Sequence, residues 1–453
     1  MMCAQISSSF ETYSPTLRWP LNIEYAQING EMVCVIKDPS GLCRQPVVVP
    51  NIIMPIIARF DGLHSICDIA KEGQSVGLTV AFVAEVAEFL DEFFLLDSTH
   101  SRLKWEQIVT DFSKSKVRML SHAGQVYSAN RDELKAQLHT YLVNRDKVKI
   151  GNDIELDRVH TIIAPHIDYS RGGKTYGQVC NILEQIPMPD IVVLLGTSHQ
   201  YSKSPFILTN KAFQTPFGIM PSAYSSINEI AELCKQEMAY DVFESEVVHR
   251  VEHSLDLQLP ILGATYENYL RDVDESINRV DSEFYLEQVD ENKYLGPSVI
   301  PILVGSFYEF VESKSNLCEV KLVEGFCNCV ASVLQDAKRN KLRVLLYCGV
   351  DLSHVGTIFG DLSKITKEGL YNLKQHDLNL ISKITSGDAL GLNEAILQTG
   401  DKFRVCGFPT LYVALRVLEL MNEPVKGHCL EYRQATEEKN DCTVSFFAGV
   451  LQS

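Results

Sequence analysis

The first hundred residues combine short alternating segments with short helical ones. Residues 31–37 alternate apolar and polar positions, which predicts a strand with one buried face. Residues 79–95 carry apolar side chains at helical spacing and predict an amphipathic helix, and Ser65 is expected to cap a shorter one. These elements predict a small α+β, winged-helix-like domain over residues 1–105. It holds no combination of catalytic residue types, so we expect a docking role.

The pattern changes after a polar stretch of mixed charge at residues 106–117, which favours a linker. Continuous apolar runs then alternate with longer helical segments. Runs of this kind are typical of strands buried on both faces, and strands alternating with helices predict an α/β layered domain, here over residues 118–453. The predicted strands are 159–164, 191–195, 298–304, 343–350 and 443–451. A strongly acidic stretch, 267–293, predicts a surface insertion.

Composition narrows the choice of partners and compartment. The 453 residues are 45% hydrophobic and 22% charged, which is ordinary for a globular protein, but the net charge is −17. An acidic surface repels phosphate backbones, so we expect no nucleic-acid partner. No apolar run is long enough for a membrane span, and residues 1–20 lack the pattern of a signal peptide. The 13 cysteines are scattered without a CxxC motif, which favours reduced thiols and a cytoplasmic location.

Polar side chains follow the predicted strands where each strand ends. His166 follows the first strand, His199 the second, and Asp351 and His354 the fourth. In α/β sheets, functional groups collect in the loops beyond the carboxyl ends of the strands. His253 lies between His199 and Asp351 in the sequence, in a segment predicted to be helical.

Cys406 completes this set just before an apolar helix at residues 409–420. Burying imidazoles and a carboxylate together is unfavourable unless they are paired or bind a metal. Imidazole suits zinc, iron, copper and nickel, and a thiolate adds a soft ligand. The sequence therefore predicts a single polar, metal-binding cleft formed by six side chains, His166, His199, His253, Asp351, His354 and Cys406.

Five motifs follow one another along the second predicted domain: PHIDYSRGG (165–173), LLGTSHQ (194–200), VEHSLDLQLP (251–260), CGVDLSHVG (348–356) and RVCGFPTLYVAL (404–415). In this order they resemble the Memo family, and most of all its bacterial branch, AmmeMemoRadiSam system protein B. Residues 121–124 (SHAG) resemble the opening of the Memo domain and 446–450 (FFAGV) its close, so the resemblance covers 118–453. The first hundred residues look like the N-terminal extension of that branch.

The resemblance implies a fold similar to class III extradiol dioxygenases, with a central mixed sheet flanked by helices. Those enzymes hold Fe(II) with two histidines and a carboxylate, and Memo proteins use a cysteine as third ligand. Carried over, this implies that His166, His199 and Cys406 bind the metal, Fe(II) first, with Cu or Zn as alternatives. His354 matches the acid/base histidine, with Asp351 one helical turn before it to orient it, and His253 matches the remaining catalytic pocket histidine.

The substrate cannot be transferred from the family, because the pocket departs from its pattern. Many Memo proteins have a Gly-Tyr pair and a second histidine after the position of His199, where this chain has residues 167–170 (IDYS) and Gln200. Arg171 and the glycine amides beside it are suited to hold an anionic group. The candidate substrate-binding residues are Arg171, Asp168, Tyr169, Glu252 and Arg404.

Three functions stay open. The first is a mononuclear non-haem iron or copper redox enzyme, in which His354 moves protons. The resemblance implies that it acts in a modification pathway with a radical S-adenosylmethionine protein and a third small-protein family. The second is a non-catalytic scaffold for a metal or peptide. The third is a zinc-type metallohydrolase with His354 as base. The identity of the metal separates the first from the third.

Overall fold

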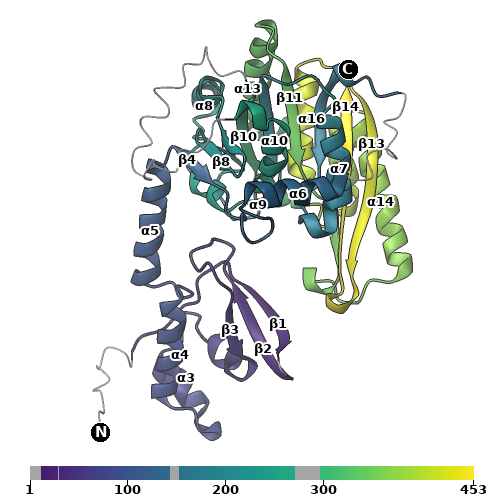
Figure 1. Cartoon of the computed structure of the whole chain (residues 1–453). Helices are drawn as coiled ribbons and strands as arrows, with labels where there is room; N and C mark the ends of the chain where they lie inside the picture. The colour runs from purple at the N-terminus through teal and green to yellow at the C-terminus, as the bar shows by residue number, and fades with distance from the viewer. Residues whose placement is uncertain (1–11, 29, 143–152, 271–295) are drawn as a thin grey trace. The chain divides into compact units, whose positions relative to one another are not determined.

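The computed structural model describes residues 12–28, 30–142, 153–270 and 296–453 (Figure 1). The chain divides into two compact units, residues 1–114 and 115–453, which are described separately. The acidic stretch predicted as an insertion, 267–293, lies outside the described residues except for its first few positions. Within the described ranges, no helix is long and apolar enough to cross a membrane.

The first unit is a small sheet domain, as predicted. An antiparallel three-stranded sheet precedes the helices in the chain, and its buried Cys34 and Ile36 share a core with Val83 and Leu90. Ser65 caps its helix with a reciprocal capping box, as expected. The elements are β1 (Asn22–Ile28), β2 (Glu31–Lys37), β3 (Val47–Pro50), α2 (Met54–Ile57), α3 (Ile66–Glu72), α4 (Val80–Glu92) and α5 (Thr99–Lys114).

The interval interpreted as a linker has regular structure. Residues 106–114 form the second half of α5, and β4 (Val117–Met119) begins the second unit. Only Ser101 and Phe112 of α5 are buried. Ile108, Val109 and Phe112 lie at helical spacing, but the other six residues of 106–114 are polar, so the composition of this interval resembles that of a linker.

The second unit is built on a mixed sheet, which confirms the predicted α/β fold. The order is β12-β14-β5-β11-β6-β10-β7, with β13 beside β14. Neighbours from β5 to β10 are parallel, whereas β14 and β7 run antiparallel to theirs. The strands are β5 (Val159–Ala164), β6 (Ile191–Thr197), β7 (Phe206–Leu208), β10 (Ser298–Val304), β11 (Val344–Gly349), β12 (His354–Val355), β13 (Lys426–Glu437) and β14 (Cys442–Gln452).

Helices cover both faces of this sheet, which explains the continuous apolar runs. In β6, Ile191, Val193 and Leu195 face one core, and Val192 and Leu194 face the other. The first core includes α8 (Tyr224–Met238), α13 (Lys321–Arg339), α14 (Lys367–Thr385), α15 (Ala389–Thr399) and α16 (Phe408–Leu420). The second includes α6 (Arg131–Leu142), α7 (Tyr169–Leu183), α9 (His253–Asp256) and α10 (Leu259–Thr265).

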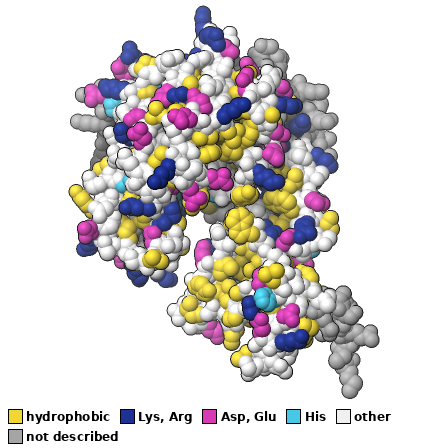
Figure 2. Space-filling model, turned by 180° about the vertical axis from the view of Figure 1, so that it is seen from behind, with side chains coloured by type: hydrophobic (Ala, Val, Ile, Leu, Met, Phe, Trp, Pro, Cys, Tyr) yellow, Lys and Arg dark blue, Asp and Glu magenta, His cyan; other side chains and the backbone are white. Residues whose placement is uncertain are grey.

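A small sheet of β4, β8 (Ala212–Thr215) and β9 (Gly218–Met220) accompanies the main one, with β4 parallel to β8. It brings the start of the second unit to the segment around β8. Acidic and basic side chains are interspersed over the face of the molecule seen in Figure 2. On that face, therefore, neither sign of charge forms a continuous patch.

Candidate metal centre

Three neighbouring parallel strands bring the predicted site residues to one edge of the sheet. His166 lies two residues after β5, Asp351 two after β11 and His199 two after β6. Since β11 pairs with both β5 and β6, the three carboxyl ends are side by side. His253 joins them as the first residue of α9, and Cys406 stands just before Gly407, the N-cap of α16.

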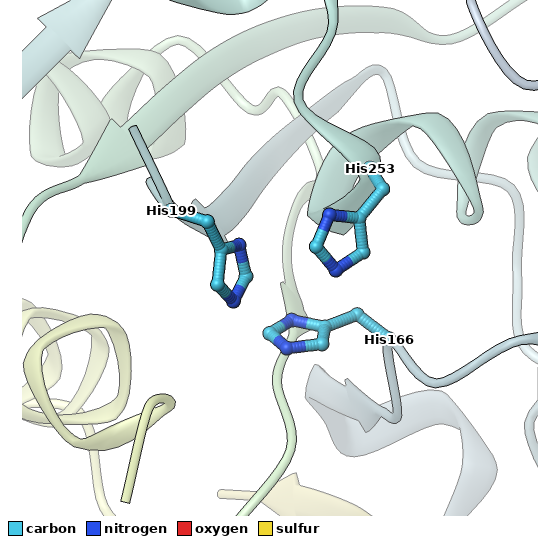
Figure 3. Close-up of side chains that lie close together, drawn as sticks. All are labelled: His166, His199 and His253. Atoms are coloured by element: carbon cyan, nitrogen blue, oxygen red, sulfur yellow. The ribbon is translucent and has the colours of Figure 1, made fainter. Parts of the chain in front are cut away.

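His166, His199 and His253 form a compact cluster, a possible metal site. One ring nitrogen from each lies within 4.8 Å of those of the other two. The ring centroids are 4.9 Å apart for His166 and His199, 5.2 Å for His166 and His253, and 4.4 Å for His199 and His253. Figure 3 shows the three imidazoles pointing toward one another from three different segments.

Each of the three imidazoles is anchored through Nδ1. His166 Nδ1 is 3.0 Å from the Gly349 carbonyl oxygen, and His199 Nδ1 is 2.9 Å from Glu252 Oε1. His253 Nδ1 is 3.2 Å from the same Oε1. Carbonyl and carboxylate oxygens only accept, so each Nδ1 carries a hydrogen in these contacts, and Nε2 is the ring nitrogen left to bind a metal. Histidine ligands of metals are held in this way.

The charge state of His166 also suits a ligand. Burial lowers its pKa well below the ordinary range, and the nearby His199 and His253 lower it further. The ring is therefore neutral near pH 7, which is the form that binds a metal.

Cys406 joins the cluster through His166. Its Sγ lies 3.3 Å from His166 Nε2. Two such ligands of one ion would stand about 3.1 to 3.6 Å apart, given typical metal–sulfur and metal–nitrogen bond lengths. Burial raises the pKa of the Cys406 thiol well above its usual range, and Asp351 adds to the effect. A bound cation would reverse this, because a coordinated thiol loses its proton. The donor set therefore fits a transition metal.

A close backbone approach holds Cys406 in place. Gly407 N donates to the Asp351 carbonyl oxygen at 3.1 Å, and Thr197 Oγ1 donates to the Cys406 carbonyl oxygen at 3.2 Å. A Cβ at Gly407 would lie 2.3 Å from the Asp351 carbonyl oxygen. A side chain there would push the loop, and Cys406 with it, away from the strand ends.

Asp351 and His354 are placed differently from the expectation that Asp351 orients His354. No helical turn connects them, because residues 351–353 are irregular. Asp351 Oδ1 instead accepts from the backbone N–H groups of His166 at 2.9 Å and Ile167 at 3.2 Å. The Nδ1 of His354 is held by the carbonyl oxygens of Leu352 and Arg404, at 3.2 and 3.3 Å.

The two side chains have opposite pKa shifts with a common cause. Burial raises the pKa of Asp351 to about 7. Burial, with a contribution from His199, lowers the pKa of His354 to about 4. The His354 ring is thus neutral at pH 7 and presents Nε2 as an acceptor.

The five predicted substrate-binding residues all make contacts within the protein. Asp168 caps α7 and pairs with Arg171. Tyr169 is completely buried and donates to the Leu257 carbonyl oxygen, which does not favour contact with a substrate. Arg404 bridges the His354 carbonyl oxygen and Asp361, at 3.0 and 2.6 Å. The fifth, Glu252, lies behind the imidazoles. Their substrate-binding roles remain predictions.

Sequence reasoning missed a buried network beside the cluster. Arg118 and Asp256 form a buried ion pair, and Arg118 also donates to the Glu252 carbonyl oxygen at 3.1 Å. His122 Nδ1 contacts Asp256 Oδ2 at 2.9 Å, and its ring centroid is 6.1 Å from that of His253. The available signal was Asp256 between two leucines, Leu255 and Leu257, and one helical turn after His253.

Comparison with known proteins points to one family. The profile described as Memo-like protein matches residues 118–274 and 317–450. The chain is 25% identical to a MEMO1 family protein of Aquifex aeolicus over 426 residues, covering 92% of this chain and 95% of the relative. It is 24% identical to a MEMO1 family protein of Thermus thermophilus over 306 residues, covering 67% and 74%. A second Aquifex aeolicus MEMO1 family protein is 31% identical over 150 residues, covering 32% and 49%.

Proposed function

Because the chain belongs to the Memo-like protein family, we propose that it is a mononuclear non-haem metal enzyme of the redox type, with Fe(II) or copper at the histidine cluster. The resemblance inferred from the motifs is confirmed at the level of the family. The observation that carries the proposal is the convergence of three imidazoles whose Nδ1 atoms are all anchored. His166 and His199 are two ligands, and His253 and Cys406 are the candidates for further ones.

The ligand set supports a redox metal. A bound Fe(II) or copper ion would supply one-electron chemistry and a site for dioxygen. Cys406 contributes a soft donor 3.3 Å from His166 Nε2, and a thiolate favours iron or copper over hard cations.

His354 is the proposed proton carrier. Its Nδ1 is fixed by two carbonyl oxygens, so Nε2 is the atom that accepts and returns a proton. Arg404 supports it by donating to the His354 carbonyl oxygen and pairing with Asp361. Asp351 acts on the other side of the site, where it holds the backbone of His166.

The partners and the location are carried over from the sequence. We propose that a radical S-adenosylmethionine protein and a third small-protein family act with this chain, and that the first unit docks one of them. In support, the Aquifex aeolicus alignment covers 92% of the chain and so extends into the first unit, outside the matched family region. A cytoplasmic location belongs to the same proposal.

A zinc-type metallohydrolase is the second candidate. Three histidines are a set that holds catalytic zinc in other enzymes, and His354 would then act as base. A metal-binding scaffold without turnover would use the same ligands.

The test is anaerobic purification followed by elemental analysis. We expect about one iron or copper ion per chain, and its loss in His166→Ala and His199→Ala. His64→Ala is the matched control, because His64 pairs with Asp61 in the first unit. Stoichiometric zinc alone would favour hydrolysis. Protein that carries no metal and takes up none would overturn the proposal.

A further inference from the structure

The carboxylate of Glu252 contacts two of the three clustered histidines. Glu252 is buried and caps the N-terminus of α9. Its Oε1 contacts His199 Nδ1 at 2.9 Å and His253 Nδ1 at 3.2 Å, and accepts from Ser254 N at 3.1 Å. Its Oε2 accepts from His199 N at 2.8 Å. In each of these four contacts an N–H group faces a carboxylate oxygen, so both oxygens of Glu252 act as acceptors.

Because His199 and His253 contact the same oxygen of Glu252, the orientations of their two rings are fixed relative to each other. His199 and His253 are stacked, with centroids 4.4 Å apart and planes 27° apart. Two nearly parallel imidazoles that point their Nδ1 atoms at one oxygen present their Nε2 atoms on the same side. That side faces His166, whose ring completes the cluster in Figure 3.

The backbone of Glu252 is also held in place, by contacts with Arg118. Arg118, buried on β4, donates to the carbonyl oxygens of Glu252 and His249 and pairs with Asp256 at the end of α9. Contacts on both sides of Glu252 therefore fix the backbone that carries it. A side chain so enclosed is suited to orient other groups rather than to meet a substrate.

We propose that Glu252 is a positioning residue that makes His199 and His253 a matched pair of metal ligands. His253 is then a ligand rather than the catalytic pocket histidine predicted from the sequence, and Glu252 is not a substrate contact. The metal part of this inference rests on the proposed function. The orientation of the rings does not.

The first measurement is metal affinity, with Zn(II) and Co(II) competed against a chelator. Glu252→Gln keeps the size of the side chain but offers one acceptor oxygen in place of two. We expect it to weaken binding about 10- to 100-fold and to alter the Co(II) absorption spectrum. His253→Ala should also weaken binding. The matched control is Glu324→Gln, since Glu324 accepts two N–H groups from Arg416 and touches none of the three histidines in the described contacts.

The second measurement needs no metal. Nitrogen-15 NMR of histidine-labelled, metal-free protein reports which ring nitrogen carries hydrogen. In the wild type we expect the Nδ1–H form at His166, His199 and His253. Glu252→Gln should perturb His199 and His253 but spare His166, whose partner is the Gly349 carbonyl oxygen. Glu324→Gln should change none of them.

The outcomes separate the two proposals. If no metal binds but Glu252→Gln shifts the two tautomers, the positioning role stands and the metal enzyme fails. If the wild type binds metal and Glu252→Gln matches it in affinity and tautomers, the positioning role is overturned. If His253→Ala binds metal as tightly as the wild type, His253 is not a ligand. Should Glu252→Gln not fold, an Nε2–H form at His199 or His253 in the wild type would itself overturn the inference.

Discussion

Asp256 illustrates how a single side chain holds the site together. It is completely buried and accepts hydrogen bonds from Arg118, His122 and Tyr127. Replacing it with Asn would leave the buried Arg118 charge without its partner. We predict that Asp256→Asn lowers the free energy of unfolding by about 3–5 kcal/mol, measured by urea denaturation. A change comparable to that of an exposed carboxylate, such as Asp132→Asn, would contradict this prediction.

Asp256 also makes the free energy of unfolding depend on pH in the acid range. Burial alone would raise the pKa of Asp256, but Arg118 and His122 outweigh it and lower the pKa to about 2, from 3.8. The unfolded state therefore binds more protons in this range, so the stabilisation is present above about pH 4 and is lost as the pH falls toward 2. Urea denaturation across this interval should show the loss in the wild type. The contribution should be missing in Asp256→Asn, and identical slopes would refute it.

Gly407 ties the backbone to the position of Cys406. A Cβ there would meet the Asp351 carbonyl oxygen at 2.3 Å, and a backbone atom cannot move away as a side chain can. We predict that Gly407→Ala costs about 1–3 kcal/mol of stability and weakens any thiolate-to-metal absorption band. Gly369→Ala is the control, because the atoms nearest its new Cβ would belong to the Ile365 side chain and the Thr366 hydroxyl, at 3.1 and 3.4 Å, and not to the backbone. Equal effects of the two changes would argue against the role given to Gly407.

At the scale of elements, the site residues that directly follow a strand are the ones that the sequence could predict. The runs 159–164 and 298–304 coincide with β5 and β10, and the others lie close to β6, β11 and β14. Strands buried on both faces leave an unbroken apolar run, and parallel neighbours place their following residues together. His166, His199 and Asp351 could therefore be assigned to one edge of the sheet from the amino-acid sequence alone.

The rest of the site depends on contacts that no local pattern encodes. The Arg118–Asp256 pair joins residues 138 apart in sequence, and α9 is a four-residue helix, too short to leave a periodic pattern. The double use of Glu252 arises only once α9 packs against the end of β6. The helical structure of residues 106–114 escaped prediction for a related reason, because a largely exposed helix and a polar linker have similar compositions.

At the scale of the whole molecule, the two units have separate hydrophobic cores. The cluster that includes Ile57 and Leu90 belongs to the first unit, and those around the main sheet belong to the second. We predict that a chain beginning at Ser115 folds alone and binds metal as tightly as the full chain. Circular dichroism and chelator competition would check this prediction. An insoluble fragment, or one with weakened metal binding, would show that the first unit is needed for the site.

The central claim is that the clustered imidazoles and Cys406 share one metal ion, and X-ray absorption at the metal edge tests it most directly. For zinc-loaded protein we predict imidazole nitrogen at about 2.0 Å and one sulfur at about 2.3 Å, with the sulfur lost in Cys406→Ser. Fewer imidazoles should be seen in His253→Ala. A shell of oxygen atoms without sulfur or imidazole, unchanged by these substitutions, would contradict the claim.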